Sequence, residues 1–310
     1  MKPRILLTGG TGQVGGELQQ LLPSLGEVIA LDRRQMDLSK PADIRRVIDE
    51  IRPQLIVNAA AYTAVDQAES DELAARIVNA DAPGLMAQEA KRIGAALVHY
   101  STDYVFDGEK NSPYEENDLP NPANVYGRTK LAGEQAILDA GVPHLIFRTA
   151  WVYGTRGRNF LLTVLRLASQ REELRIVQDQ IGAPTWCRDI ARATVSILRH
   201  FSENGETPFS FSGVSGTYHM TAGGSASWYD FARAILGEAS QAPDGLSWLT
   251  SATNGRPLIV RCVLPITTPE YPTPAHRPAY SVLSNSLLAS TFAIRLPEWH
   301  HALHAAFRVE

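Results

Sequence analysis

The chain has 310 residues, 44% of them hydrophobic and 20% charged, which is typical of a globular protein with one large or two smaller domains. The formal net charge of -4 argues against nucleic acid or an anionic membrane as a partner. Cys187 and Cys262 are the only cysteines; they are too few for a structural zinc cluster and are expected to be reduced thiols.

The first half of the chain alternates short apolar runs with helical patterns. The start of the chain, residues 1–7, is too short for the apolar region of a signal peptide and runs directly into glycines. No apolar run approaches the ~20 residues of a membrane span, so we expect a cytoplasmic protein. The expected strands cover residues 4–7, 27–31, 55–57, 96–100 and 144–147, and the expected helices cover residues 17–22, 42–51, 72–94 and 128–138. This alternation predicts an α/β fold with a Rossmann-type, doubly wound parallel sheet that binds ligands at the carboxyl edge of its strands.

After about residue 150 the pattern loosens. Helices are expected at residues 159–169, 188–200 and 227–239, and short strands at residues 175–177 and 218–220. Residues 264–278 contain five prolines and must be mostly extended or looped. We therefore expect a dinucleotide-binding domain in residues 1–150, with a return segment near residues 171–201, and a smaller mixed α/β substrate domain formed mainly by residues 151–310.

A glycine-rich loop, TGGTGQVG at residues 8–15, lies between the first strand and the first helix. Gly9, Gly12 and Gly15 satisfy one nucleotide-binding spacing, and Gly10, Gly12 and Gly15 satisfy another. Glycines permit the tight turn and let backbone N–H groups approach a pyrophosphate at the helix N-terminus. A flexible turn would give the same composition, but the strand before and the helix after it favour a dinucleotide site.

Acidic and basic residues follow the second strand and bear on the cofactor. Asp32 lies 20 residues after Gly12, where a carboxylate accepts hydrogen bonds from the adenosine ribose. It favours NAD, whereas Arg33 and Arg34 favour the 2′-phosphate of NADP, so use of either NADH or NADPH is expected. Asp37 lies close enough to meet the adenine or, equally, to belong to a helix N-terminus.

Tyr126 and Lys130 are spaced to share one face of a helix. An ammonium beside a phenol stabilises the phenolate and lowers its pKa, which makes a proton donor for a carbonyl that receives hydride. Tyr-x-x-x-Lys alone is a common pattern and often a solvated helix pair. Here Thr102, after the fourth strand, supplies a hydroxyl that can tune the proton transfer, so Tyr126, Lys130 and Thr102 are the candidate catalytic residues.

Longer motifs extend this interpretation to nearly the whole chain. They are TGGTGQVG at 8–15, NAAAYTAVDQAE at 58–69, STDYVFDG at 101–108, YGRTKLAGE at 126–134, RTAWVYG at 148–154, QIGAPT at 180–185, SWYDFA at 227–232 and EYPTPAHRPAYSVL at 270–283. With these motifs the chain resembles the extended short-chain dehydrogenases and, within them, the dTDP-4-dehydrorhamnose reductase family. The resemblance implies that NAD(P)H delivers hydride to C4 of dTDP-4-dehydro-L-rhamnose while Tyr126 protonates the oxygen.

The resemblance also assigns roles to individual positions. With the loop residues above, the candidate cofactor-binding residues are Gly9, Thr11, Gly12, Gln13, Val14, Asp32, Arg33, Asp37, Leu38, Ala59, Ala60, Ala61, Tyr62, Thr63, Tyr126 and Lys130. The candidate substrate-binding residues are Thr102, Asp103, Tyr126, Trp151, Trp228 and Arg277. Trp151 suits a sugar platform or plain core packing. Arg277 suits a diphosphate contact or a structural salt bridge.

The chain departs from its relatives at one position. Some family members bind magnesium at a dimer interface through glutamates, and Glu17 matches one of them. Arg188 stands where another is expected, and an arginine repels a cation, so we predict no metal site. A homodimer formed by another route stays open.

Two other functions remain as alternatives. A sugar-nucleotide dehydratase would carry a second carboxylate after Asp103, where this chain has Tyr104. The catalytic residues alone do not separate a reductase from a sugar-nucleotide epimerase. A non-catalytic regulatory subunit of the methionine adenosyltransferase type also resembles this family, but such a protein has no need for Tyr126 and Lys130.

Overall fold

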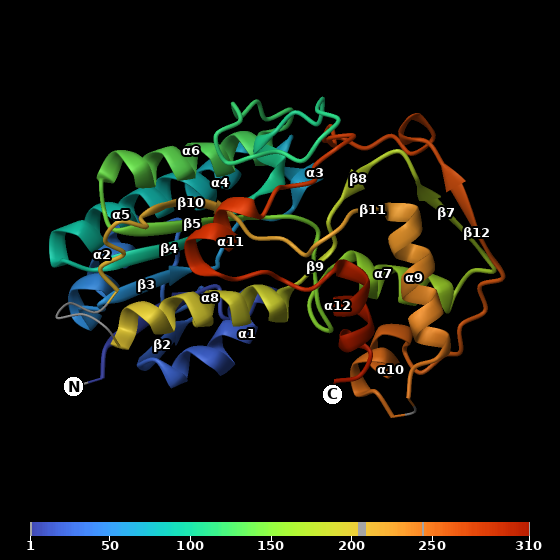
Figure 1. Ribbon diagram of the computed structural model, residues 1–310, viewed down its shortest axis with the longest axis horizontal. Coiled ribbons are helices and arrows are strands. Elements are labelled where there is room, and N and C mark those ends of the chain that lie inside the picture. Colours follow the sequence, from blue (N-terminus) through green and yellow to red (C-terminus); the bar gives the residue numbers. More distant parts are fainter. Residues whose placement is uncertain (1, 204–208, 244, 310) are drawn as a thin grey trace.

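The computed structural model describes residues 2–203, 209–243 and 245–309. A six-stranded parallel sheet with the order β10-β5-β4-β3-β1-β2 forms the middle layer of the larger part, on the left in Figure 1. The strands are β1 (Arg4–Thr8), β2 (Glu27–Leu31), β3 (Leu55–Asn58), β4 (Ala96–Thr102), β5 (His144–Thr149) and β10 (Gly216–His219). The central strands β3, β4 and β5 are buried throughout, as apolar strands covered on both faces should be. The predicted doubly wound sheet is confirmed.

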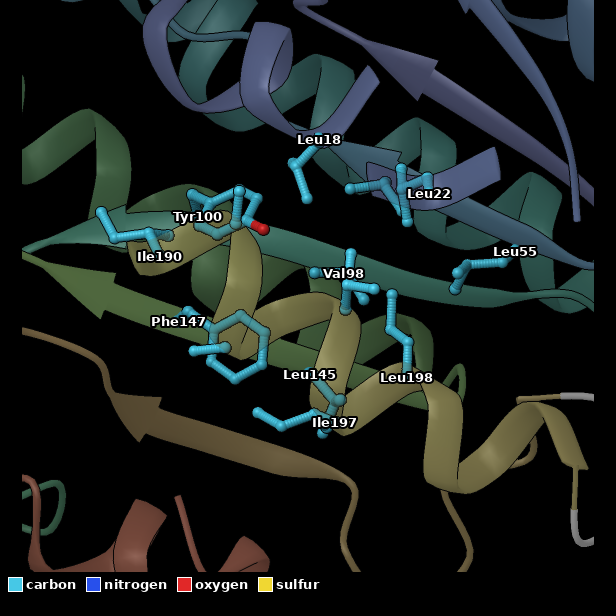
Figure 2. Packing of buried hydrophobic residues seen from close by; sticks show 14 of the residues in the cluster. Leu18, Leu22, Leu55, Val98, Tyr100, Leu145, Phe147, Ile190, Ile197 and Leu198 are labelled. Carbon is cyan, nitrogen blue, oxygen red and sulfur yellow. The ribbon is translucent and has the colours of Figure 1, made fainter. Parts of the chain in front are cut away.

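Helices cover both faces of this sheet. On one face lie α1 (Gln13–Leu21) and α8 (Cys187–Glu203). Figure 2 shows Leu18 of α1, Val98 of β4 and Leu198 of α8 in the apolar core between these helices and the sheet. On the other face, α2 (Pro41–Ile51), α5 (Ala82–Ile93) and α6 (Val125–Ala140) bury a second apolar cluster. The single turn η1 (Leu22–Ser24) follows α1, and α3 (Val65–Ala68) and η3 (Asp103–Val105) follow β3 and β4.

The helix expected over residues 72–94 is interrupted. It consists of α4 (Glu72–Arg76), a wider π-helical turn η2 (Ile77–Asp81) and α5. Pro83 has no N–H to donate to the carbonyl of Asn79, so the α-helical ladder is broken at this place. Asn79 is buried there and its side chain bonds both backbone groups of Tyr62 and the hydroxyl of Thr129.

A second hydrophobic core lies beside the carboxyl edge of the large sheet. Four helices enclose it with a small parallel sheet: α7 (Phe160–Ala168), α9 (Trp228–Ser240), α10 (Ser247–Thr253), α12 (Trp299–Ala306), β7 (Glu173–Val177) and β12 (Cys262–Ile266). Two short pairs connect the parts, β6 (Val152–Tyr153) with β9 (Thr185–Trp186) and β8 (Ile181–Gly182) with β11 (Ala226–Ser227). The turn η4 (Thr268–Glu270) opens the long extended segment that follows β12, as its prolines predicted.

The second half of the chain returns to the large sheet more than once. The α8 helix packs against α1, and β10 pairs in parallel with β5. The α11 helix (Ser286–Phe292) contributes Leu288 to the core below β10. The strand expected at residues 218–220 is therefore a sixth strand of the large sheet. Within the described residues, no helix combines the length and the apolar character needed to cross a bilayer.

Candidate active site

The glycine loop is built so that side chains would not fit. Gly9 has φ +71°, and a Cβ placed there would lie 2.6 Å from the backbone of Ala59. A Cβ at Gly15 would come 2.1 Å from the carbonyl oxygen of Gly9, so the start of α1 can pack against the loop only with glycine. Gly12 is the N-cap of α1 and, having no side chain, leaves the helix N-terminus uncovered. This cradle fits a pyrophosphate group and brings Ala59 and Ala60 beside the loop.

The other candidate cofactor residues are of two kinds: polar side chains after β2, and apolar side chains that pack in the cores. Asp32 is exposed at the end of β2, and its Oδ1 accepts from the N–H of Arg34 at 2.8 Å. Arg33 reaches Asp37 at 3.8 Å, and hydrogen bonds from Ser39 lower the pKa of Asp37. Val14 and Leu38 pack against the apolar clusters, so a cofactor would meet them mainly through backbone or a side-chain edge.

Gln13 ties the glycine loop to the segment after β5. Its Oε1 accepts from Asn159 Nδ2 at 2.8 Å, and its Nε2 donates to the carbonyl of Val152 at 3.5 Å. Thr11, in the loop, and Thr63, after β3, are exposed, while Ala61 and Tyr62 are partly buried. The backbone of Tyr62 is fixed by Asn79, which sequence reasoning did not single out.

Tyr126 and Lys130 lie on the first turns of α6. Asn124 caps this helix by accepting from the N–H of Gly127 at 2.8 Å, and Glu69 accepts from the N–H of Val125. Tyr126 is partly buried beside Tyr104, with ring centroids 5.9 Å apart, whereas Lys130 is only 1% exposed. The helix thus presents the phenol at the carboxyl edge of the sheet and the amine in the interior.

Without a cofactor, the net shift of the Tyr126 pKa is upward and not downward as expected. Burial raises the pKa of Tyr126 to about 12, and a hydrogen bond with Thr102 only partly opposes this. The Nζ of Lys130 is turned toward the interior, where it donates to the carbonyl of Tyr100 at 2.7 Å and meets His99 Nε2 at 3.0 Å. Burial also lowers the pKa of Lys130 to about 8.

Thr102 and Asp103 lie at the end of β4, both almost fully buried. The hydroxyl of Thr102 donates to Asp103 Oδ1 at 3.0 Å and accepts from the N–H of Tyr104 at 3.1 Å. Burial raises the pKa of Asp103 to about 7, although hydrogen bonds from Ser281 and Thr102 oppose this. The structure thus brings Tyr126 and Thr102 together, and it places Asp103 beside them, whereas the amine of Lys130, the third candidate catalytic residue, bonds His99 and the carbonyl of Tyr100.

Two tryptophans from distant parts of the chain form a stacked pair. The rings of Trp151 and Trp228 are nearly parallel, at 3°, with centroids 3.4 Å apart. Trp151 has φ 45° and lies directly over Gly182, where a Cβ would come 2.4 Å from its ring. Trp228 also donates from Nε1 to Gln180 Oε1 at 3.2 Å. Both rings are partly exposed, so the stack offers an aromatic surface beside the carboxyl edge.

Arg277 forms the salt bridge that was the alternative to a diphosphate contact. Its Nη2 lies 2.8 Å from Asp66 Oδ2, and its Nη1 donates to the carbonyl of Ala275 at 3.3 Å. Asp66 also accepts from the N–H of Ala275 at 3.2 Å. The pair therefore fastens the proline-rich C-terminal segment to α3.

The glutamate that resembled a magnesium ligand is held by arginines. Glu17 is buried; its Oε1 lies 3.1 Å from Arg156 Nη2 and its Oε2 lies 2.9 Å from Arg188 Nε. Both carboxylate oxygens are thus occupied by protein cations. Among the residues that the structure describes, no three His, Cys, Asp or Glu side chains gather in a way that could hold a metal ion.

Sequence reasoning missed a buried ion pair behind the catalytic helix. Glu134, one turn after Lys130, accepts from Arg148 of β5 through three bonds of 3.0, 3.2 and 2.6 Å. Both side chains are almost fully buried, and Arg148 also lies over the ring of Phe106. The spacing of Lys130 and Glu134 was visible in the sequence, but the partner on β5 was not.

A parallel sheet with a glycine cradle at one strand and a Tyr-Lys helix at its carboxyl edge defines a NAD(P)-dependent oxidoreductase of the short-chain dehydrogenase class. The family model described as RmlD substrate binding domain matches residues 1–309. The chain therefore belongs to this family of reductases.

Individual relatives agree with this assignment. The chain is 48% identical over 306 residues to a dTDP-4-dehydrorhamnose reductase of Burkholderia thailandensis, with 98% of each chain covered. It is 43% identical over 299 residues to the enzyme of that name from Escherichia coli, covering 95% of this chain and 94% of the relative. A Bacillus anthracis dTDP-4-dehydrorhamnose reductase solved in complex with NADP superimposes with a TM-score of 0.85 at 36% identity, covering 99% of each chain. These relatives support the reductase interpretation and not the regulatory-subunit alternative.

Proposed function

We propose that this protein reduces the C4 keto group of dTDP-4-dehydro-L-rhamnose to give dTDP-L-rhamnose, with NADH or NADPH as reductant. The observation that carries the proposal is the grouping of Tyr126, Thr102 and Asp103 at the carboxyl edge of the sheet, next to the glycine cradle. The names of the relatives supply the sugar and the nucleotide.

Each side chain has a separate task in this proposal. The cofactor, when bound, supplies the hydride. Tyr126 donates its phenolic proton to the C4 oxygen as that oxygen gains negative charge. Thr102 hydrogen-bonds Tyr126 and, with its O–H turned from Asp103 to the substrate, donates to the same substrate oxygen, which holds the donor and the acceptor in line. Lys130, in its ammonium form, stabilises the phenolate that remains and holds the nicotinamide ribose.

The sugar nucleotide would lie between the carboxyl edge and the second core. The exposed parts of the Trp151–Trp228 stack offer a surface for the sugar ring, and Asp103 offers hydrogen bonds to its hydroxyl groups. Arg277 is retained as a diphosphate contact even though it pairs with Asp66, because a guanidinium can bind two anions at once. Cofactor binding is assigned to residues 1–150 together with the returning segments, and substrate binding mainly to residues 151–310.

The direct test mixes purified protein with dTDP-4-dehydro-L-rhamnose and either NADH or NADPH. Loss of absorbance at the nicotinamide band and formation of dTDP-L-rhamnose are expected with at least one cofactor. Absence of oxidation with both cofactors would disprove the proposed reaction. Because the Asp32 and Arg33 features oppose each other, we expect turnover with both cofactors and a modest preference.

Replacement of the proton donor is the sharper test. Tyr126→Phe should lower kcat by about 10²- to 10⁴-fold while NADH affinity, measured by fluorescence titration, changes little. Tyr104→Phe is the matched control, since its ring lies edge-on to Tyr126 but its hydroxyl has no assigned chemical role. Equal turnover in wild type and Tyr126→Phe would show that another group donates the proton.

We also infer a cytoplasmic location, where the nicotinamide cofactors are available, and leave open a homodimer. Glu17 is already neutralised by Arg156 and Arg188, so a dimer would not need magnesium at this position. Sedimentation of the protein with and without a chelator tests this, and a chelator-dependent change in mass would contradict it.

A further inference from the structure

A row of polar side chains crosses three neighbouring strands below the catalytic helix. Thr8, Asn58 and His99 are direct partners in the register of β1, β3 and β4, so their side chains point to the same face. All three are buried, with Asn58 and His99 fully so. The row ends at Lys130 of α6, whose Nζ lies 3.0 Å from His99 Nε2.

The backbone fixes the orientation of the Asn58 amide. The N–H of Ala60 donates to Asn58 Oδ1 at 3.2 Å, and the hydroxyl of Thr8 donates to the same oxygen at 2.7 Å. A backbone N–H can only donate, so the atom that faces Ala60 must be the amide oxygen. The Nδ2 group is therefore directed at His99 Nδ1, 3.0 Å away.

This orientation selects one tautomer of His99. An amide NH₂ can only donate, so His99 Nδ1 must accept and carries no proton. The single proton of the neutral ring is then on Nε2, which faces Lys130. An ammonium group has no lone pair to receive this proton, whereas a neutral amine has one. The hydrogen bonds are all satisfied only when Lys130 is a neutral amine that accepts from His99 and donates to Tyr100.

We propose that His99, locked in one tautomer by Asn58, is a positioning residue that favours the neutral amine of Lys130 and thereby sets the upper pH limit of the reduction. Protonation of Lys130 requires the ring proton to move to Nδ1 and the Asn58 amide to turn away from Ala60 and Thr8. Formation of the Lys130 ammonium, which is needed to stabilise the Tyr126 phenolate, therefore requires hydrogen bonds among Thr8, Asn58 and His99 to break. The lowered pKa of both Lys130 and His99 agrees with this.

Other charged groups near His99 and Lys130 do not account for the preference for a neutral Lys130. Glu134 favours the ammonium of Lys130, but it is already paired with Arg148 of β5. The remaining titratable groups on α6 are Tyr126, Arg128 and Asp139. Those on or next to the elements packed against it are Asp66, Glu69, Glu72, Arg76, Asp81, Glu89, Lys91, Arg92, Tyr100, Asp103 and Tyr104. Of these, Asp66 is paired with Arg277 and Asp81 with Arg76. Only His99 contacts Lys130 Nζ by a side-chain hydrogen bond among the residues that the structure describes.

The test exploits the small number of lysines. The chain has five, and Lys130 is the one that is buried. Protein labelled with ¹³Cε- and ¹⁵Nζ-lysine and with ¹⁵N-histidine is titrated by NMR without cofactor. We expect Lys130 to titrate well below the other four lysines, and His99 to carry its proton on Nε2 where Lys130 is neutral. A Lys130 signal that stays ammonium to pH 10, or a proton on Nδ1 there, would overturn the proposal.

Two substitutions of Asn58 test the lock itself. The carboxylate of Asn58→Asp should accept a hydrogen bond from a protonated His99 Nδ1, which reverses the tautomer and raises the pKa of Lys130 by about one pH unit or more. Asn58→Leu releases the tautomer but adds no charge, so it should raise the pKa of Lys130 by less than Asn58→Asp does. The difference between the two variants separates the effect of the tautomer from the effect of the new carboxylate. His144→Gln, at a buried histidine of β5 far along the strand from Lys130, is the control and should leave the pKa of Lys130 unchanged.

The kinetic consequence rests on the proposed reaction, whereas the NMR measurements do not. In wild type, kcat/KM for reduction should fall above about pH 8, and in Asn58→Asp that fall should move upward by about one pH unit. A shifted Lys130 pKa with an unshifted kinetic profile would overturn the role of His99 in setting the pH limit. If Asn58→Asp does not fold, His99→Gln must give an upward shift of the Lys130 pKa, and its failure to do so counts against the proposal.

Discussion

Asp103 illustrates how a single buried group at this site lowers stability at neutral pH. Its side chain is only 2% exposed, and burial raises its pKa from 3.8 to about 7. The folded protein thus holds a proton on Asp103 between about pH 4 and pH 7 that the unfolded chain releases. The free energy of unfolding therefore falls as pH rises through this window, by up to roughly 4 kcal/mol.

Replacement by the neutral amide removes this cost. We expect Asp103→Asn to raise the free energy of unfolding at pH 8 and to have little effect near pH 3, measured by denaturant unfolding at both pH values. Asp107→Asn is the control with the opposite sign, because hydrogen bonds from Tyr114 and Asn121 lower the pKa of Asp107. That variant should lose stability at pH 8. If Asp103→Asn changed the free energy of unfolding equally at both pH values, the pKa of Asp103 would not be raised by its burial.

Single residues also show where sequence reasoning ends. The spacing of Tyr126 and Lys130 predicts the catalytic helix, and the position of Thr102 follows because it ends a predicted strand. His99 lies inside an apolar run, where a histidine is ordinarily part of the core, so the sequence does not mark it. Its role becomes visible only when β1, β3 and β4 are aligned in register, which brings Thr8 and Asn58 beside it. Register comes from tertiary pairing and not from spacing along the chain.

At the scale of elements, α6 is positioned by close backbone contact as well as by apolar burial. Gly133 lies against the π-helical turn η2, and a Cβ there would come 2.1 Å from the carbonyl oxygen of Asn79. That carbonyl belongs to the turn created by Pro83. The π-helical turn in the long helix and Gly133 of α6 therefore touch each other directly. This contact lets α6 lie near the sheet and keeps Lys130 close to it.

We expect Gly133→Ala to lower the free energy of unfolding by about 1–3 kcal/mol, because the methyl group has no room and must displace backbone. Gly237→Ala is the matched control, since Gly237 is an exposed glycine inside α9 and an added Cβ would meet nothing within 4 Å. The control should gain about 0.5–1 kcal/mol from helix propensity. Chemical unfolding measures both, and a gain in both variants would refute the close contact.

The strands and helices of the first half are predictable because buried parallel strands are continuous apolar runs between helical patterns. The helix over residues 72–94 is predicted in place, but its π-turn is not, since a proline in a helical pattern does not say how the chain accommodates it. The Glu134–Arg148 pair is not predictable because its partners lie on a helix and a strand whose packing distance the sequence does not contain.

At the scale of the whole molecule, the Trp151–Trp228 stack joins the two parts that bind cofactor and substrate in our proposal. Trp151 follows β5 of the large sheet, and Trp228 begins α9 of the second core. The 3.4 Å separation of the ring centroids leaves no space between the rings, so a sugar would bind against the edge of the stack or displace one ring.

We expect Trp228→Leu to raise KM for the sugar nucleotide by about tenfold, with the NADPH affinity unchanged. Trp299→Leu is the control, because Trp299 is also partly buried and touches Phe231 but lies apart from the stack. Steady-state kinetics and cofactor fluorescence separate the two effects. Equal KM changes in both variants would mean that the stack contributes packing alone.

The return of the chain to its first sheet has a consequence for biosynthesis. Among the described strands, β10 is the one that covers the sheet edge at β5, and the core beneath β10 receives Leu288 of α11. When residue 150 leaves the ribosome, that edge is still unpaired, and roughly 70 further residues must be translated before β10 can pair with β5, which takes about 3–14 s. During this time the nascent chain exposes an apolar strand edge of the kind that chaperones bind, and the core beneath β10 is completed only after α11 has been translated as well.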